Sequence, residues 1–177
     1  MRRLLDGLYL GAGIAGALAI FLIFLLVGIQ VSARLVDALM RVMGLRAFGF
    51  IVPSIAEICG FLLAAGSFLA LPYTLVKGGH IRIGMVVDRL PTAVRRYTEA
   101  LVGLAAASIA AYAALALGRL TIKSLSFNDV SYGIIPIPLA LPQGLMTIGL
   151  IVFAIAILDV TWRAFARGES LPGAQEV

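Results

Sequence analysis

The sequence has few charged side chains and almost no cysteine or histidine. Only 13% of its 177 residues are Asp, Glu, Lys or Arg, whereas a soluble domain typically carries about 25%. The single cysteine, Cys59, cannot form an internal disulfide, and the single histidine, His80, leaves no Cys/His spacing that would hold a metal. These shortages argue against most soluble enzymes, and we expect no metal and no other cofactor.

Four long apolar runs fill the chain, and most of the charges lie between them. Hydrophobic residues make up 62% of the sequence. A helix needs about 20 apolar residues to cross a bilayer core that is about 30 Å thick, and each run is long enough. The sequence therefore predicts an all-α integral membrane protein with four transmembrane helices. We expect the spans at about 8–33, 53–76, 92–122 and 141–166.

These spans leave no room for a second domain. We expect a single membrane domain over residues 1–166 and a polar tail over 167–177. The net charge of +5 does not indicate a nucleic-acid partner, because the basic residues are scattered over membrane-flanking loops and are not gathered on one face. The membrane lipids are the expected partner of these loops.

The distribution of basic residues predicts the orientation. Short cytoplasmic loops collect Lys and Arg. The N-terminus, the stretch 77–96 and the C-terminal side of the last span together hold nine of the 14 basic residues. We therefore expect both termini in the cytoplasm. Trp162, near the end of the last span, fits the aromatic belt at the membrane interface.

A short segment after the first span is amphipathic. Arg34, Asp37 and Arg41 share one helical face, whereas Leu35 and Leu39 share another. This pattern predicts a short helix that lies at the membrane interface, with its arginines toward the lipid headgroups. A helical extension of the first span is the alternative.

Small residues recur inside the spans at helical spacing. Gly103, Ala107 and Ala111 line up four residues apart in the third span. Such spacing lets helix backbones approach closely in lipid, so we expect this face to bind a partner. A G-x-G-x-x-G pattern at 11–16 matches a dinucleotide fingerprint, but it lies within a membrane span and lacks the preceding strand. We interpret it as a helix-packing face.

Glu57 is the one ionisable side chain well inside a predicted span. An intramembrane carboxylate is costly unless it is paired or hydrated, so it is a functional hypothesis by default. Three roles are open: an ion pair with an arginine of this chain, of which Arg34 and Arg46 are the nearest candidates in sequence; a contact with a partner subunit; and the binding of a proton or cation. We prefer them in that order, because a lone carboxylate without other acids is a poor ion site.

The segment that follows the second span has a distinctive pattern, Lys-Gly-Gly-His-Ile-Arg-Ile at 77–83. Its glycines, including Gly79, predict a tight turn at the cytoplasmic interface. Polar and apolar side chains then alternate, which directs His80 and Arg82 toward headgroups or a partner. Catalysis by His80 would need a nucleophile or carboxylate held beside it, and the sequence offers no convincing set.

This turn, followed by Asp88 and Leu90-Pro91, resembles the hallmark of the small membrane subunit of tripartite ATP-independent periplasmic (TRAP) transporters, the DctQ-like proteins. An arginine that closes the first span, a glutamate early in the second and a Pro-x-x-x-Pro-x-Gly opening at 138–144 also fit. Gly84 departs from the pattern, because the family often has an acidic residue there.

The resemblance implies a cation-driven importer of the bacterial inner membrane. A periplasmic solute-binding protein would deliver small organic acids to two membrane subunits. The large subunit would carry the substrate and cation sites and move as an elevator. The present chain would be a non-catalytic scaffold that binds the large subunit.

Two other classes of protein stay open. A self-sufficient homo-oligomeric carrier or channel would need a polar stripe along the spans. An intramembrane enzyme would need a nucleophile and a base inside the bundle. The chain lacks the broken half-helices and the inverted repeat expected at the site of a secondary carrier.

Overall fold

The computed structural model describes residues 2–79 and 91–167, and this part of the chain forms four α-helices. They are α1 (Arg2–Val42), α2 (Ile55–Val76), α3 (Thr92–Phe127) and α4 (Ala140–Arg167). Each is long and apolar enough to cross a membrane. Within the described residues there is no strand, only an isolated bridge between Val130 and Pro138. The prediction of an all-α membrane protein with four spanning helices is confirmed.

The expected short interfacial helix does not exist as a separate element. α1 continues without a break to Val42, so the alternative, a helical extension of the first span, is the one observed. The chain has no glycine or proline between residues 29 and 43 that would interrupt the helix. Gly44, with a φ of +72°, then ends it. An upright helix of 41 residues is about 60 Å long, roughly twice the hydrocarbon thickness.

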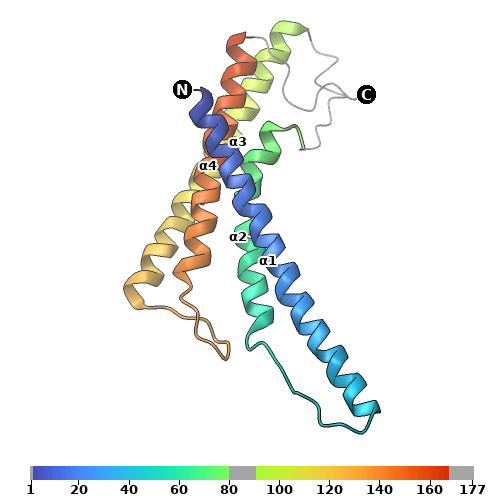
Figure 1. Cartoon of the computed structure of the whole chain (residues 1–177). Helices are drawn as coiled ribbons and strands as arrows, with labels where there is room; N and C mark the ends of the chain where they lie inside the picture. The colour runs from blue at the N-terminus through green and yellow to red at the C-terminus, as the bar shows by residue number, and fades with distance from the viewer. Residues whose placement is uncertain (1, 80–90, 168–177) are drawn as a thin grey trace.

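The helices are arranged as two pairs that meet along α2 and α4 (Figure 1). α1 packs on α2, and α3 packs on α4, whereas α1 touches α4 only slightly. The two pairs lie together near the N-terminus and diverge toward the opposite end, where the connections 43–54 and 128–139 lie (Figure 1). In its most apolar stretch α4 is 44% buried and α1 only 11%. α4 is therefore the central helix of an open arrangement.

Glycines set the closest approach between α1 and α2. A Cβ atom added to Gly16 would lie 2.9 Å from the carbonyl oxygen of Gly66, and one added to Gly13 would lie 2.8 Å from the Tyr73 side chain. Larger side chains at these positions would push the helices apart. The G-x-G-x-x-G segment therefore serves helix packing, as the sequence predicts.

Buried polar side chains hold the connection between α1 and α2. The carboxylate of Asp37 accepts the backbone N–H groups of Phe48, at 2.7 Å, and Gly49, at 3.0 Å. Gln30 Oε1 accepts the N–H of Val52 at 2.8 Å. Asp37 is only 5% exposed, so it faces this connection and not the headgroups. These bonds satisfy backbone donors that have no helical partner and tie the connection back along α1.

The connection between α3 and α4 is folded on itself as a hairpin, here called the α3–α4 hairpin (residues 128–139). The N–H of Ser131 donates to the carbonyl of Ile137 at 2.9 Å, and the N–H of Ile137 donates back to Ser131 Oγ at 3.1 Å. The N–H of Leu139 donates to the carbonyl of Asp129 at 3.0 Å. Tyr132 and Ile134 are exposed at the tip of the hairpin.

Candidate partner interface

The small-residue face of α3 is largely covered by α4. A Cβ atom on Gly103 would lie 2.7 Å from Cγ2 of Thr161, and Ala107 is 4% exposed in a cluster with Ala154. Of the three small residues on this face, Gly103, Ala107 and Ala111, only Ala111 is exposed. The close approach predicted for this face is therefore made within the chain at Gly103 and Ala107. A partner contact of Ala111 stays a prediction.

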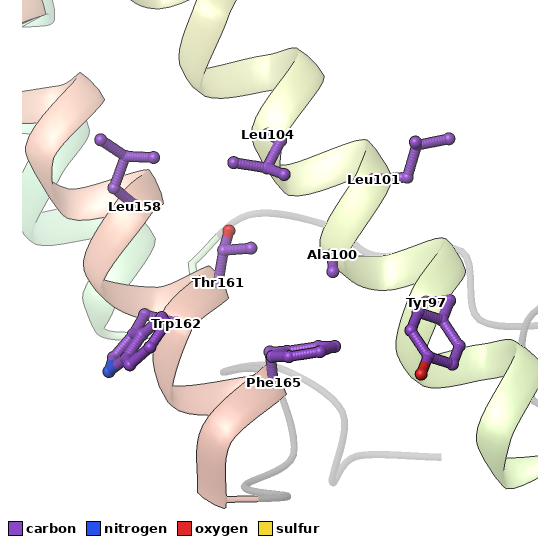
Figure 2. A pocket seen from close by; sticks show the side chains of 8 residues that line it. All are labelled: Tyr97, Ala100, Leu101, Leu104, Leu158, Thr161, Trp162 and Phe165. Atoms are coloured by element: carbon purple, nitrogen blue, oxygen red, sulfur yellow. The ribbon is translucent and has the colours of Figure 1, made fainter.

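Trp162 lies on the outer surface, beside a groove between the start of α3 and the end of α4 (Figure 2). Its side chain is 69% exposed. Leu104 and Leu158 face one another at one end of the groove, and Tyr97 and Phe165 lie at the other (Figure 2). An exposed tryptophan near the end of a spanning helix is well placed for the lipid contact that the sequence predicts.

Arg34 and Arg41 are exposed on the extension of α1. Neither forms an ion pair with another residue in the part of the chain that the structure describes. Their predicted contact with lipid headgroups stays a prediction.

Among the residues that the structure describes, no group of three or more His, Cys, Asp or Glu residues could hold a metal ion.

Gly79 closes the end of α2. Gly78 has a φ of +75°, and the N–H of Gly79 donates to the carbonyl of Thr74 at 2.9 Å, which is the capping pattern expected of a glycine beyond a helix end. The turn predicted here is therefore present. His80 and Arg82 lie outside the described residues, so their contact with a partner or with headgroups stays a prediction.

Glu57 lies in the first turn of α2, against the α3–α4 hairpin. Its Oε2 atom is buried and has no hydrogen-bond partner among the described residues. No ion pair joins it to Arg34 or Arg46 in that part of the chain, and both arginines are exposed. The role that we preferred for Glu57, an ion pair with an arginine of this chain, is therefore not observed among the described residues. Its contact with a partner subunit and its binding of a proton or cation stay predictions.

The carboxylate of Glu57 instead fills the space beside Gly133 in the α3–α4 hairpin. A Cβ atom on Gly133 would overlap Glu57 Oε2 and would lie 2.7 Å from Ser54 Oγ. Ser54 Oγ in turn accepts the N–H of Ile135 at 3.0 Å. The start of α2 and the α3–α4 hairpin therefore fit together only because residue 133 has no side chain.

The fit between Glu57 and Gly133 can be tested by a double-mutant cycle. We expect Gly133→Ala to lower the free energy of unfolding by about 1–3 kcal/mol, because the new methyl group must displace the carboxylate or the hairpin. Glu57→Ala removes the obstruction, so the same glycine substitution should cost much less in that background. Thermal unfolding in detergent gives the four values. An equal cost of Gly133→Ala in both backgrounds would show that the two residues are not coupled.

Sequence reasoning missed Ser54 and Gly133. Neither is charged, and neither belongs to a repeated pattern, so the sequence carries no signal that would join them. The sequence predicts that Asp37 shares the polar face of an interfacial helix with Arg34 and Arg41, whereas the structure buries it against the connection that follows α1. The strongest signal in the sequence is the apolar length of the spans, which predicts the helices but not the contacts between them.

The comparison with known families agrees with this architecture. The family model described as "Tripartite ATP-independent periplasmic transporters, DctQ component" matches residues 23–167, well over half of the chain. The match includes all of α2, α3 and α4 and about half of α1. No curated protein and no solved structure matches the chain. The chain is a multi-pass membrane component of a transporter, and it belongs to the DctQ family of TRAP transporters.

Proposed function

We propose that this chain is the non-catalytic scaffold subunit of a TRAP-type importer, which binds and stabilises the large permease subunit in the bacterial inner membrane. Family membership supports the proposal. The observation that carries it is the open packing of the helices: the most apolar stretch of α1 is only 11% buried within the chain. A chain that covers so little of its own helix surface has room for a large membrane partner as well as lipid.

The polar side chains in the spans bond within the protein, which favours a structural role over a transport path. The hydroxyl groups of Ser108 and Thr147 donate to carbonyls one turn earlier in their own helices, at 2.9 and 2.8 Å. Thr121 and Thr147 also approach each other at 3.3 Å, which links α3 to α4. These hydroxyls have partners within the protein, and the contact between Thr121 and Thr147 holds two helices together. They do not make the polar stripe that a self-sufficient carrier would need.

The finer parts of the proposal come from the family. We propose small organic acids as the cargo, delivery by a periplasmic solute-binding protein, and coupling to a cation whose site lies in the large subunit. Both termini would face the cytoplasm. The end of the molecule that holds the N-terminus supports this orientation, because it carries a group of basic residues. They are Arg2, Arg3, Lys77, Arg95, Arg96 and Arg163, at the start of α1 and α3 and the end of α2 and α4.

Association with the large subunit can be tested by co-purification. A tagged chain, expressed with its large TRAP permease partner, should retain that permease through detergent extraction and size-exclusion chromatography. Ala111→Trp should weaken the association, because the bulky ring would hold apart two surfaces that meet at a small residue. Ala105→Trp is the matched control, since Ala105 is also exposed on α3 but lies about 120° around the helix.

The outcomes distinguish failure of the scaffold role from failure of the Ala111 contact alone. If the wild-type chain and the permease do not co-purify, the scaffold role is contradicted. If Ala111→Trp associates as well as the wild type, Ala111 is not at the interface, although another exposed face can still be. Chain that elutes only as a homo-oligomer and transports solute alone would favour the carrier or channel.

A further inference from the structure

An apolar groove opens on the outer surface between α3 and α4. Its volume is about 630 Å³, which is within the range of roughly 300–1,000 Å³ typical of sites for small organic ligands. The groove exists because Ala100 leaves its floor low, whereas Leu104, Leu158 and Trp162 form taller walls (Figure 2). Its lining is almost entirely hydrocarbon and aromatic, so it suits an apolar chain and not a polar solute.

A fixed cation lies beside one end of this groove. The guanidinium carbon of Arg96 lies 4.5 Å from the centre of the Phe165 ring, and its Nη2 donates to the carbonyl oxygen of Phe165. Phe165 itself lines the groove next to Tyr97. These contacts hold the charge where the groove meets the end of α4. A guanidinium has five N–H donors, so one bond to a carbonyl leaves others for an anion.

Arg96 differs from the basic side chains near it. Arg95 pairs with Glu99 at 3.0 Å, and Arg163 pairs with Asp159 at 3.0 Å. Arg96 is exposed, and no carboxylate of the described residues lies within ion-pair distance of it. Its charge is therefore available to an external anion, and a guanidinium matches the geometry of a phosphate.

We propose that the groove binds one acyl chain of an anionic phospholipid, with the lipid phosphate held by Arg96. The ligand must combine an apolar chain with an anionic group at one end, because the groove and the cation are adjacent. Tyr97 and Trp162 are both largely exposed here, and aromatic side chains of this kind sit at headgroup depth. A lipid at this site is independent of the scaffold role, so either proposal can fail without the other.

Trp162 provides a direct probe, because it is the only tryptophan in the chain and it lines the groove. The full chain is reconstituted into phosphatidylcholine vesicles, into which phosphatidylglycerol or phosphatidylcholine with brominated acyl chains is titrated. Bromine quenches tryptophan fluorescence at close range. We expect the anionic lipid to be preferred by about fivefold, which is the factor that one arginine near anionic headgroups supplies.

Four variants, one of them a control, locate the preference. Arg96→Gln should reduce it to near unity, whereas Arg96→Lys should retain most of it, because the charge is kept. Arg119→Gln is the matched control: it removes an exposed arginine from the far end of the same helix and should leave the preference unchanged. Ala100→Phe should fill the floor of the groove and reduce quenching by both lipids.

Equal quenching by the two lipids in the wild-type chain would overturn the proposal. So would a preference that survives in Arg96→Gln, since the phosphate would then be bound elsewhere. If Arg96→Gln does not fold, loss of quenching in Ala100→Phe with unchanged helix content by circular dichroism supports the groove. Unchanged quenching in that variant overturns it.

Discussion

Replacing Gly149 by alanine is expected to separate α2 from α4 and to lower the free energy of unfolding by roughly 1–3 kcal/mol. A Cβ atom at this position would lie 2.6 Å from both the carbonyl carbon and the carbonyl oxygen of Phe68. These are backbone atoms, so no side-chain rotation can relieve the overlap. The two helices must move apart, and the contact between the two helix pairs is made along them.

The sequence of α2 explains why the backbone is approached at this point. Pro72, which is fully buried, lies four residues after Phe68 and has no N–H group to donate to that carbonyl. In lipid, a carbonyl freed by proline is tolerated where a neighbouring helix covers it. Gly149 brings the backbone of α4 against it. We therefore expect the alanine variant to lose packing and to expose a polar backbone group.

The matched control for this prediction is Gly144→Ala on the same helix. There the nearest atom to an added Cβ is Cγ2 of Thr121, at 3.7 Å, which is an ordinary contact. Because alanine favours a helix over glycine, this variant should be unchanged or more stable by up to about 1 kcal/mol. Thermal unfolding in detergent micelles compares the two. Similar midpoints for Gly149→Ala and the wild type would show that α2 and α4 are not packed this closely.

The spanning helices could be predicted from the sequence because their cause is local. An uncharged apolar run of about 20 residues has one low-energy structure in a bilayer, a helix that bonds its own backbone groups. Whether the segment after residue 33 forms a separate helix or extends the first span could not be predicted in the same way. An amphipathic face looks the same whether the helix bends onto the interface or continues straight, and α1 continues to Val42.

The contacts of the site were less predictable, because they join residues far apart in the chain. Four-residue spacing of small side chains predicts that a helix will approach Gly103 and Ala107, but it does not say whose helix it is. In the structure it is α4 of the same chain. The buried pair Glu57 and Gly133 has no periodic signal, since its members lie on a helix and a hairpin that meet only in the folded chain.

Omission of this chain from the reconstituted importer should remove solute uptake. The large subunit would carry the substrate and cation sites, and it would need a fixed support against which to move. The present chain would supply that support through helix surface that it does not cover itself. We therefore expect a loss down to the background rate of protein-free vesicles, which is a larger effect than any single substitution in this chain should produce.

The most direct measurement is the initial rate of uptake of a small organic acid that the cognate solute-binding protein binds. Vesicles are prepared with the large subunit alone, with this chain alone, and with both, under the same cation gradient. The account predicts uptake above background only in vesicles that hold both membrane subunits. Uptake by this chain alone, or full-rate uptake by the large subunit without it, would contradict the scaffold role.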